Sequence, residues 1–288
     1  MTRVGFVVHA GRAAAVDAAR ELATTCAEAG ESTIELEGQP VGAAERRRPE
    51  AFADGLDLAV SVGGDGTLLR AAHLVASAGV PVLGVKVGRM GFLTEVEPDL
   101  AGPLLRRAIE GSARVEERLA VVAEPVEPGT FEAQWALNEI IVEKEARHRL
   151  VRLGVEVDGT YVTTFSADGV IVATPTGSTA YSFSVRGPIV TPSVDCLLVT
   201  PVAAHMVFDR TLVVDPGEQV LLEVVGEVGG LLSADGRETI TLPVGTRVRI
   251  RAADTPFRLV RRDDAPSFLA LVRDKFDLPD DPGVGAEG

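Results

Sequence analysis

The chain has 288 residues, a formal net charge of −14 at pH 7 and 46% apolar side chains. These values fit a globular protein of one large or two ordinary domains, and the acidic balance argues against nucleic acid or an anionic membrane as a partner. No apolar run approaches the roughly 20 residues that span a bilayer, and residues 1–3 pass directly into a strand, so we expect the cytoplasm. Cys26 and Cys196 lack metal-ligand spacing and are interpreted as reduced thiols.

The first part of the chain, residues 1–115, alternates between predicted strands and helices. The apolar runs that predict strands are 4–8, 33–36, 58–62 and 81–85, and the helical segments are 13–29, 68–78 and 99–109. Continuous apolar strands that alternate with helices are typical of an α/β domain, with a parallel sheet covered by helices on both faces. The first strand-to-helix turn, 9–12, lacks the G-x-G-x-x-G pattern of dinucleotide-binding domains.

From residue 116 to 262 the pattern changes to short β-rich runs separated by turn residues. Asp158-Gly159 between two of these runs indicates a two-residue hairpin. We expect an all-β, sandwich-like second domain. The segment 263–278 carries a short helical stripe that we expect to return to the first domain, and the composition of 279–288 is typical of a disordered tail.

The sequence GGDGT at 63–67 follows an apolar strand and precedes a helix. This arrangement suits phosphate, because backbone without side chains can approach the ligand while a helix N-terminus offers unpaired N–H groups. Asp65 stands where a typical phosphate loop holds a lysine. A carboxylate would repel phosphates, so Asp65 is better suited to the group that receives the phosphate. The turn therefore predicts a kinase whose acceptor is an alcohol.

Two further patterns lie in the β-rich half. The turn 174–181 offers hydroxyls, a glycine and Tyr181, which suits a ribose and a stacked base, although a helix start with a core tyrosine fits the same residues. Asn138-Glu139 could hold vicinal ribose hydroxyls, although an isolated pair of this kind usually lies on the surface. Positive charge lies at Arg70, Lys86 and Arg89 and in the run 144–152, which is either a solvated strand edge or an anion site.

In order and spacing, these motifs together with 88–93, Asp168-Gly169, Ser184 and 233–236 resemble those of the NAD kinase family over nearly the whole chain. GGDGT is shared with lipid kinase-like and phosphofructokinase-like enzymes, whereas the turn 176–181 with Asn138-Glu139 is more specific. The resemblance implies transfer of the terminal phosphate of ATP or polyphosphate to the 2′-hydroxyl of the adenosine ribose of NAD. It also implies a divalent metal such as Mg²⁺ with the donor, and a homodimer or homotetramer.

The resemblance also implies roles for individual residues. Asp65 would contact and deprotonate the 2′-hydroxyl, Tyr181 would stack on adenine, and Asn138 and Glu139 would hold ribose hydroxyls. The remaining implied substrate contacts are Gly64, Gly66, Arg70, Phe92, Arg149, Asp168, Thr179, Ala180, Ser184 and Ala203. Lys86 stands where relatives often carry asparagine and could add charge for the donor phosphates, and His205 is interpreted as structural.

A carboxylate at a helix N-terminus is a weak base, because the helix dipole favours its charged form. Phosphoryl transfer tolerates a weak base, since its loose transition state does not require a fully deprotonated nucleophile. We therefore expect Asp65 to orient the hydroxyl and accept its proton late. The alternatives are a lipid kinase of the same superfamily, which should lack the turn 176–181, and a catalytically silent NAD or NADP sensor, which should lack the carboxylate.

Overall fold

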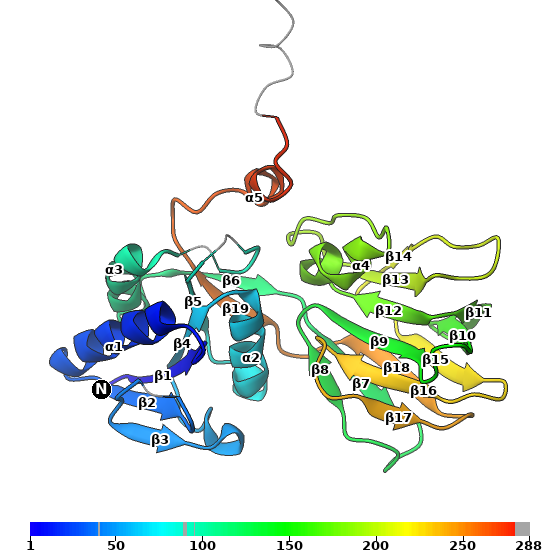
Figure 1. Cartoon of the computed structure of the whole chain (residues 1–288), viewed down its shortest axis with the longest axis horizontal. Coiled ribbons are helices and arrows are strands. Elements are labelled where there is room, and N and C mark those ends of the chain that lie inside the picture. The colour runs from blue at the N-terminus through cyan, green and yellow to red at the C-terminus, as the bar shows by residue number, and fades with distance from the viewer. Residues whose placement is uncertain (40, 89–90, 95, 280–288) are drawn as a thin grey trace, which may run out of the picture. The chain divides into compact units, whose positions relative to one another are not determined.

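The computed structural model describes residues 1–39, 41–88, 91–94 and 96–279. It divides into two compact units, Met1–Glu117 with Arg258–Gly288, and Arg118–Phe257 (Figure 1). Arg89, to which the sequence assigned positive charge, and residues 280–288 of the expected tail lie outside the described residues. No helix in the described segments has the length and apolar character needed to cross a bilayer.

The first unit is an α/β domain. Its strands are β1 (Arg3–Val8), β2 (Ser32–Leu36), β3 (Glu45–Arg47), β4 (Leu58–Gly63), β5 (Val82–Lys86), β6 (Arg114–Arg118) and β19 (Phe257–Arg261). Its helices are α1 (Ala13–Glu28), α2 (Asp65–Val75), α3 (Pro98–Ile109) and α5 (Phe268–Lys275), with short 3₁₀ turns η1 (Pro49–Ala51) and η2 (Ala76–Ala78). The strands form one sheet in the order β3-β2-β1-β4-β5-β19-β6. The pairs from β3 through β19 are parallel, as the continuous apolar runs predicted.

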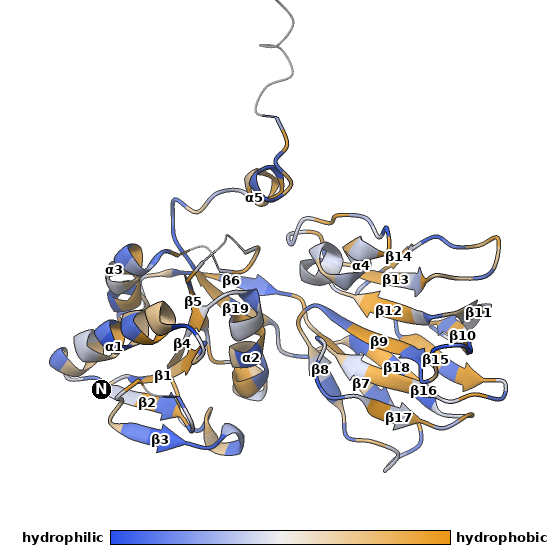
Figure 2. Ribbon diagram, viewed as in Figure 1, coloured by the Kyte–Doolittle hydropathy of each residue, from blue (hydrophilic) through white to orange (hydrophobic). Residues whose placement is uncertain are grey.

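The two faces of this sheet differ in side-chain size. Leu58, Val60 and Val62 of β4 belong to the apolar core that also contains buried residues of α1 and α3. On the opposite face, Gly84 of β5 lies against Leu68, so α2 packs closely over small residues. Helices therefore cover both faces, which confirms the predicted fold class. In Figure 2 the central strands β1, β4 and β5 have the apolar colour, whereas the edge strands β3 and β6 are hydrophilic.

The second unit is built from two antiparallel sheets. Its strands are β7 (Val121–Pro125), β8 (Gln134–Ala136), β9 (Glu139–Lys144), β10 (Val151–Val157), β11 (Thr160–Ala167), β12 (Gly169–Ala173), β13 (Leu197–Val202), β14 (Leu212–Val214), β15 (Val220–Val225), β16 (Gly230–Ala234), β17 (Ile240–Leu242) and β18 (Arg247–Ala252). One sheet has the order β11-β10-β15-β18-β7-β8, and the other β14-β13-β12-β9-β16-β17. Apolar side chains of both sheets share one buried core, which confirms the expected sandwich.

Two sequence expectations meet their structure here. Asp158 and Gly159 both have positive φ, 47° and 77°, and join β10 to β11, as the hairpin signal predicted. We expected residues up to 262 in the second domain, but β19 pairs with β5 in the sheet of the first unit. An apolar run predicts a strand without saying which sheet it joins, so the sequence did not place β19.

Phe165 of β11 tests the sandwich core, because its side chain is fully buried and stacks on Phe208 with ring centroids 6.1 Å apart. Phe165→Ala should lower the free energy of unfolding by about 3–5 kcal/mol, since it removes apolar contacts and leaves a cavity. Tyr161 lies on the same strand with 61% of its surface exposed, and Tyr161→Ala is the matched control, with an expected change within about 0.5 kcal/mol. Urea unfolding followed by circular dichroism compares the two, and equal losses would contradict the assigned core.

Candidate active site

The GGDGT segment forms the junction between β4 and α2. β4 ends at Gly63, and Gly64, in extended conformation, precedes the first helical residue, Asp65. Among the described residues, no side chain caps α2, and the amides of Thr67 and Leu68 donate to Gly64 O at 2.9 and 3.2 Å. The amides of Asp65 and Gly66 are the ones that suit an anion, as expected for a strand, a glycine turn and a helix.

The side chain of Asp65 accepts hydrogen bonds from the backbone of a second loop, which contains residues 92–94. Its Oδ2 accepts a hydrogen bond from Phe92 N at 2.8 Å, and its Oδ1 accepts from Leu93 N at 3.2 Å and from Thr94 N and Oγ1, both at 3.0 Å. A Cβ at Gly91 would overlap this carboxylate, so the loop needs glycine there. We refer to these contacts as the Asp65 clamp. A carboxylate offers about four acceptor positions, two on each oxygen, and within the described residues Oδ2 accepts one bond.

A cavity of about 500 Å³ lies beside the glycine turn, at the carboxyl ends of β1 and β4. Its lining combines the residues around the α2 N-terminus with the β1–α1 turn: Val8, His9, Ala10, Gly11, Arg12, Gly64, Gly66, Thr67 and Arg70. Two guanidinium groups and the helix N-terminus make this cavity suitable for an anion. Arg12 is held in place by donating from Nη1 to Val87 O at 2.7 Å.

Gly64, Gly66 and Arg70, which the sequence predicted as substrate contacts, line this cavity. His9 and Arg12 also line it, and the sequence did not predict them as contacts. The turn 9–12 was set aside because it lacks the dinucleotide pattern. β1 and β4 are adjacent parallel strands, so the turns that follow their carboxyl ends meet at one edge of the sheet. This adjacency is the signal that could have pointed to the turn 9–12. Lys86 could have added charge for the donor phosphates, but its Nζ lies 3.1 Å from Glu97 Oε1, so a carboxylate already compensates its charge.

Asn138-Glu139 is held in the second unit by a similar device. The carboxylate of Asp235 accepts from Leu137 N and Asn138 N at 2.8 Å and from Glu139 N at 3.0 Å, which we refer to as the Asp235 clamp. On the other side, Thr174 N donates to Asn138 O at 2.9 Å and Thr174 Oγ1 donates to Leu137 O at 2.6 Å. The backbone before β9 is therefore fixed from two directions.

The turn 174–181 forms a 3₁₀ helix, η3 (Thr176–Thr179), and a short helix, α4 (Tyr181–Ser184). A Cβ at Gly177 would overlap the backbone of Asn138, so only glycine allows this close approach. The contact brings the two sequence patterns of the β-rich half together. Tyr181, with 39% of its surface exposed, begins α4 beside Glu139.

Glu139 is a buried carboxyl group with 8% of its surface exposed. Burial, assisted by the nearby charge of Asp235, raises its pKa to about 8, against the lowering effect of a hydrogen bond from the backbone N–H of Tyr181. Its Oε2 has no hydrogen-bond partner among the described residues. Glu139 is therefore protonated at neutral pH and can donate as well as accept a hydrogen bond.

Several charged side chains lie near Tyr181. Burial raises the pKa of its hydroxyl, and the charges of Glu143, Asp168 and Glu139 raise it further, whereas Lys144 opposes them. Lys144 Nζ donates to Asp168 Oδ1 at 2.5 Å. The structure thus brings Asn138, Glu139, Asp168 and Tyr181 together, which the sequence assigned to one ligand.

The remaining predicted residues have simpler positions. Thr179 and Ala180 are half-buried in the turn before Tyr181, and Ser184 is exposed at the end of α4. Ala203, with φ of +47°, follows Val202, whose carbonyl accepts from Asp168 N at 2.9 Å. Arg149 is exposed at the end of the turn 146–149. The ring of Phe92, which we expected beside adenine, contacts Phe268 with centroids 6.1 Å apart.

The pKa of Glu139 predicts a pH dependence of stability. The folded state holds this proton up to about pH 8 while the unfolded carboxyl loses it near 4.5, so the contribution is complete at low pH and is lost as the pH rises. Glu139→Gln stays neutral, so its free energy of unfolding relative to wild type should rise between pH 5 and 8, by at most about 1.4 kcal/mol per pH unit. Urea unfolding of both proteins at matched pH measures this difference, and a difference independent of pH would contradict it.

Comparison with known proteins covers both units. The ATP-NAD kinase N-terminal domain model matches residues 4–113 and the ATP-NAD kinase C-terminal domain model matches residues 137–262. The NAD kinase of Nocardia farcinica is 40% identical over 295 residues, which cover 95% of this chain and 91% of the relative. The NAD kinase of Thermobifida fusca is 42% identical over 293 residues, which cover 95% of this chain and 89% of the relative.

Solved structures share the fold. Yeast NADH kinase complexed with NADH has a TM-score of 0.88 at 20% identity, with 98% of this chain and 89% of that chain covered. An NAD kinase from Archaeoglobus fulgidus in complex with ATP has a TM-score of 0.74 at 24% identity, with 96% and 97% covered. With both domain models matched in order and relatives about 40% identical over most of its length, this chain belongs to the NAD kinase family.

Proposed function

We propose that this NAD kinase uses Asp65 to hold the 2′-hydroxyl of the adenosine ribose and the cavity beside the glycine turn to hold the donor phosphates. The observation that carries the proposal is the Asp65 clamp, which fixes the carboxylate and, among the described residues, leaves an acceptor position on Oδ2. A hydroxyl can donate to that position. The matches to NAD kinase domains in both units favour this activity over a lipid kinase, and the presence of Asp65 favours it over a silent sensor.

The proposed reaction needs little from Asp65 beyond placement. The ribose oxygen forms a bond to the terminal phosphorus of ATP, the bond from that phosphorus to its bridging oxygen breaks, ADP leaves, and the hydroxyl proton passes to Asp65. Asp65 already accepts four hydrogen bonds, which fix the position of its carboxylate. A carboxylate suffices as the proton acceptor when the transition state is loose and the reacting groups are correctly placed.

The two groups of polar residues suit different parts of the substrates. The cavity of the first unit offers Arg12, Arg70 and helix amides, which favour phosphates. The group around Tyr181 is acidic, with Glu143 and Asp168 against Lys144, which disfavours phosphate and suits ribose hydroxyls and the positively charged nicotinamide ring. We assign protonated Glu139 and Asn138 to ribose hydroxyls, and the exposed ring of Tyr181 to stacking on adenine.

Mg²⁺, the oligomeric state and the cytoplasm stay predictions. The described residues group no three His, Cys, Asp or Glu side chains that could hold a metal ion. We propose that Mg²⁺ is held mainly by the donor phosphates and water, as is usual for this ion in kinases, and we assign no step to a metal held by the protein. We also propose a homodimer or homotetramer, as the sequence resemblance implies.

Asp65→Asn tests the role of the carboxylate. The amide cannot accept the proton, and its nitrogen cannot accept a hydrogen bond from the 92–94 loop, so kcat for NADP formation should fall by about 10²- to 10⁴-fold, while the Kd for NAD should change by less than about threefold. Asp99→Asn is the matched control, because Asp99 also lies in the first turn of a helix, α3, and is exposed. An NADP-specific coupled dehydrogenase assay measures the rate, and a kcat near that of wild type in Asp65→Asn would contradict the assignment.

Arg70→Ala tests the donor site. Loss of one charge-assisted contact to phosphate should raise the KM for ATP by about 10- to 100-fold, which corresponds to the 1.5–3 kcal/mol of such hydrogen bonds, and should leave the KM for NAD nearly unchanged. Arg48, with 80% of its side chain exposed and outside this cavity, provides the control Arg48→Ala. A change in the KM for NAD without a change for ATP would assign the cavity to NAD instead. The same assay with polyphosphate tests the second candidate donor.

A further inference from the structure

The Asp65 clamp is only as rigid as the loop that supplies its donors. Of those donors, Phe92 N makes the shortest bond, 2.8 Å, and belongs to a residue whose ring lies in an aromatic cluster. The ring centroids of Phe268 and Phe276 lie 6.1 and 6.4 Å from that of Phe92, and Lys275 Nζ lies 5.8 Å from the same centroid. The three partners come from the last helix and the residue after it.

We infer that α5 is a positioning element for catalysis: Phe268 and Phe276 hold the ring of Phe92, and through its backbone they hold the carboxylate of Asp65. The inference rests on the proposed function of Asp65. The route from α5 to the reacting hydroxyl has two links, the ring contacts and then the hydrogen bond from Phe92 N to Asp65 Oδ2. It uses the oxygen to which we assign the substrate hydroxyl.

The helix is built to present these aromatic rings. Ser267 caps it by accepting from Ala270 N at 3.2 Å, so the helix begins at Phe268. Leu271 and Val272 are buried, whereas Leu269 has 68% of its surface exposed. Phe268 and Phe276 are about two helical turns apart, which brings both rings to the same side. Two members of the apolar stripe that the sequence predicted for this segment, Phe268 and Phe276, therefore lie against Phe92.

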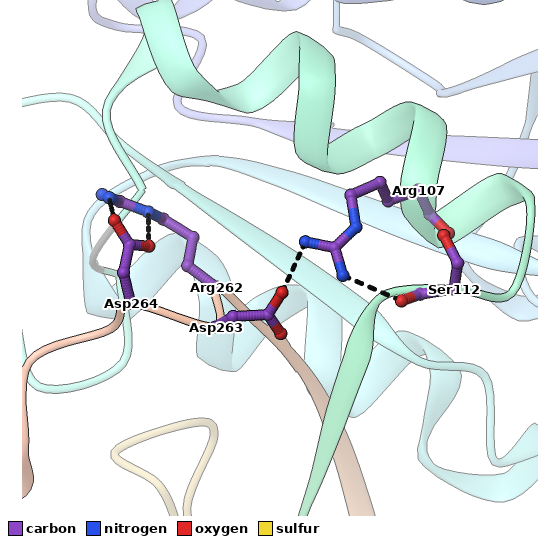
Figure 3. A network of polar contacts seen from close by, with 5 residues as sticks. All are labelled: Arg107, Ser112, Arg262, Asp263 and Asp264. Carbon is purple, nitrogen blue, oxygen red and sulfur yellow. Dashed lines mark hydrogen bonds and ion pairs between the residues drawn. The ribbon is translucent and has the colours of Figure 1, made fainter.

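The segment before α5 is tied to the first unit at a second place. Arg107 of α3 donates from Nη1 to Asp263 at 2.7 Å and from Nη2 to Ser112 O at 3.0 Å, and Arg262 pairs with Asp264 (Figure 3). The side chains of Arg107 and Asp263 are 42% and 62% exposed, and ion pairs this accessible to solvent contribute little stability on their own. These ion pairs set the direction of the chain after β19. The contacts of Phe268 and Phe276 with Phe92 then connect α5 to the Asp65 clamp.

Loss of the ring contacts should lower kcat more than it lowers the stability of the first unit. When the ring contacts are lost, the amides of 92–94 are no longer held against Asp65, and the carboxylate gains freedom to move. Displacements of about 1 Å at reacting groups cost up to about 100-fold in rate. Because α5 touches the loop rather than the cavity with Arg12 and Arg70, donor binding should be little affected.

The test uses the full chain with Phe268→Ala and Phe276→Ala, each beside the conservative Phe→Leu change, and with Leu269→Ala as the matched control on the exposed side of the same helix. The Ala variants should lose about 10- to 100-fold in kcat, with the KM for ATP within about twofold of wild type. Phe268→Leu and Phe276→Leu should keep part of the rate that the Ala variants lose, and Leu269→Ala should behave as wild type. Hydrogen exchange at the amides of Phe92, Leu93 and Thr94 should speed up in the Ala variants only.

Wild-type kcat together with unchanged exchange at these three amides in both Ala variants would overturn the inference. Faster exchange with unchanged kcat would also overturn it, because the clamp would then not limit the reaction. If the Ala variants do not fold, the Leu variants carry the same comparison with a smaller expected loss. If wild type itself forms no NADP, the proposed function fails, whereas exchange at 92–94 still decides whether α5 holds the loop.

Discussion

The position of the Asp65 carboxylate is the constraint on which the candidate site of the first unit depends. Three consecutive backbone amides and the hydroxyl of Thr94 converge on it across about 27 residues of sequence. The parallel sheet makes this possible, because β4 and β5 are neighbours and their carboxyl ends place the glycine turn and the 91–94 loop together. A side chain that holds a loop in this way is itself held, and this reciprocal fixing allows the carboxylate to act by its position.

In the second unit, too, a carboxylate accepts hydrogen bonds from consecutive backbone amides. The Asp235 carboxylate accepts hydrogen bonds from three consecutive amides, 137–139, and so fixes the backbone that carries Asn138 and Glu139. Gly177 lets the 174–181 turn come into contact with that backbone, so Tyr181 begins its helix beside Glu139. The result is a buried carboxyl group with a pKa of about 8 next to an exposed aromatic ring. Protonated Glu139 can donate a hydrogen bond, which an ordinary ionised glutamate cannot do.

Much of the fold was predictable, because continuous apolar runs and turn residues report directly on strands and hairpins. The sheet that contains β19 was not, since its run carries no record of its partner. At the candidate site, the sequence drew attention to the GGDGT turn and the 174–181 turn, but it could not show that Asp65 is clamped by 92–94 or that Glu139 is buried. Side chain to backbone bonds between distant segments leave no periodic pattern. His9 and Arg12 were missed because adjacency of β1 and β4 was not used.

The most direct test of the account is a high-resolution crystal structure of the complex with NAD and a non-hydrolysable ATP analogue. The account predicts that the 2′-hydroxyl of the adenosine ribose lies within hydrogen-bond distance of Asp65 Oδ2, with the bonds from Phe92, Leu93 and Thr94 still in place and the terminal phosphate beside Arg12 and Arg70. A carboxylate rotated away from 92–94, or a different hydroxyl group of NAD at Oδ2, would contradict the central claim that the clamp sets the geometry of phosphoryl transfer.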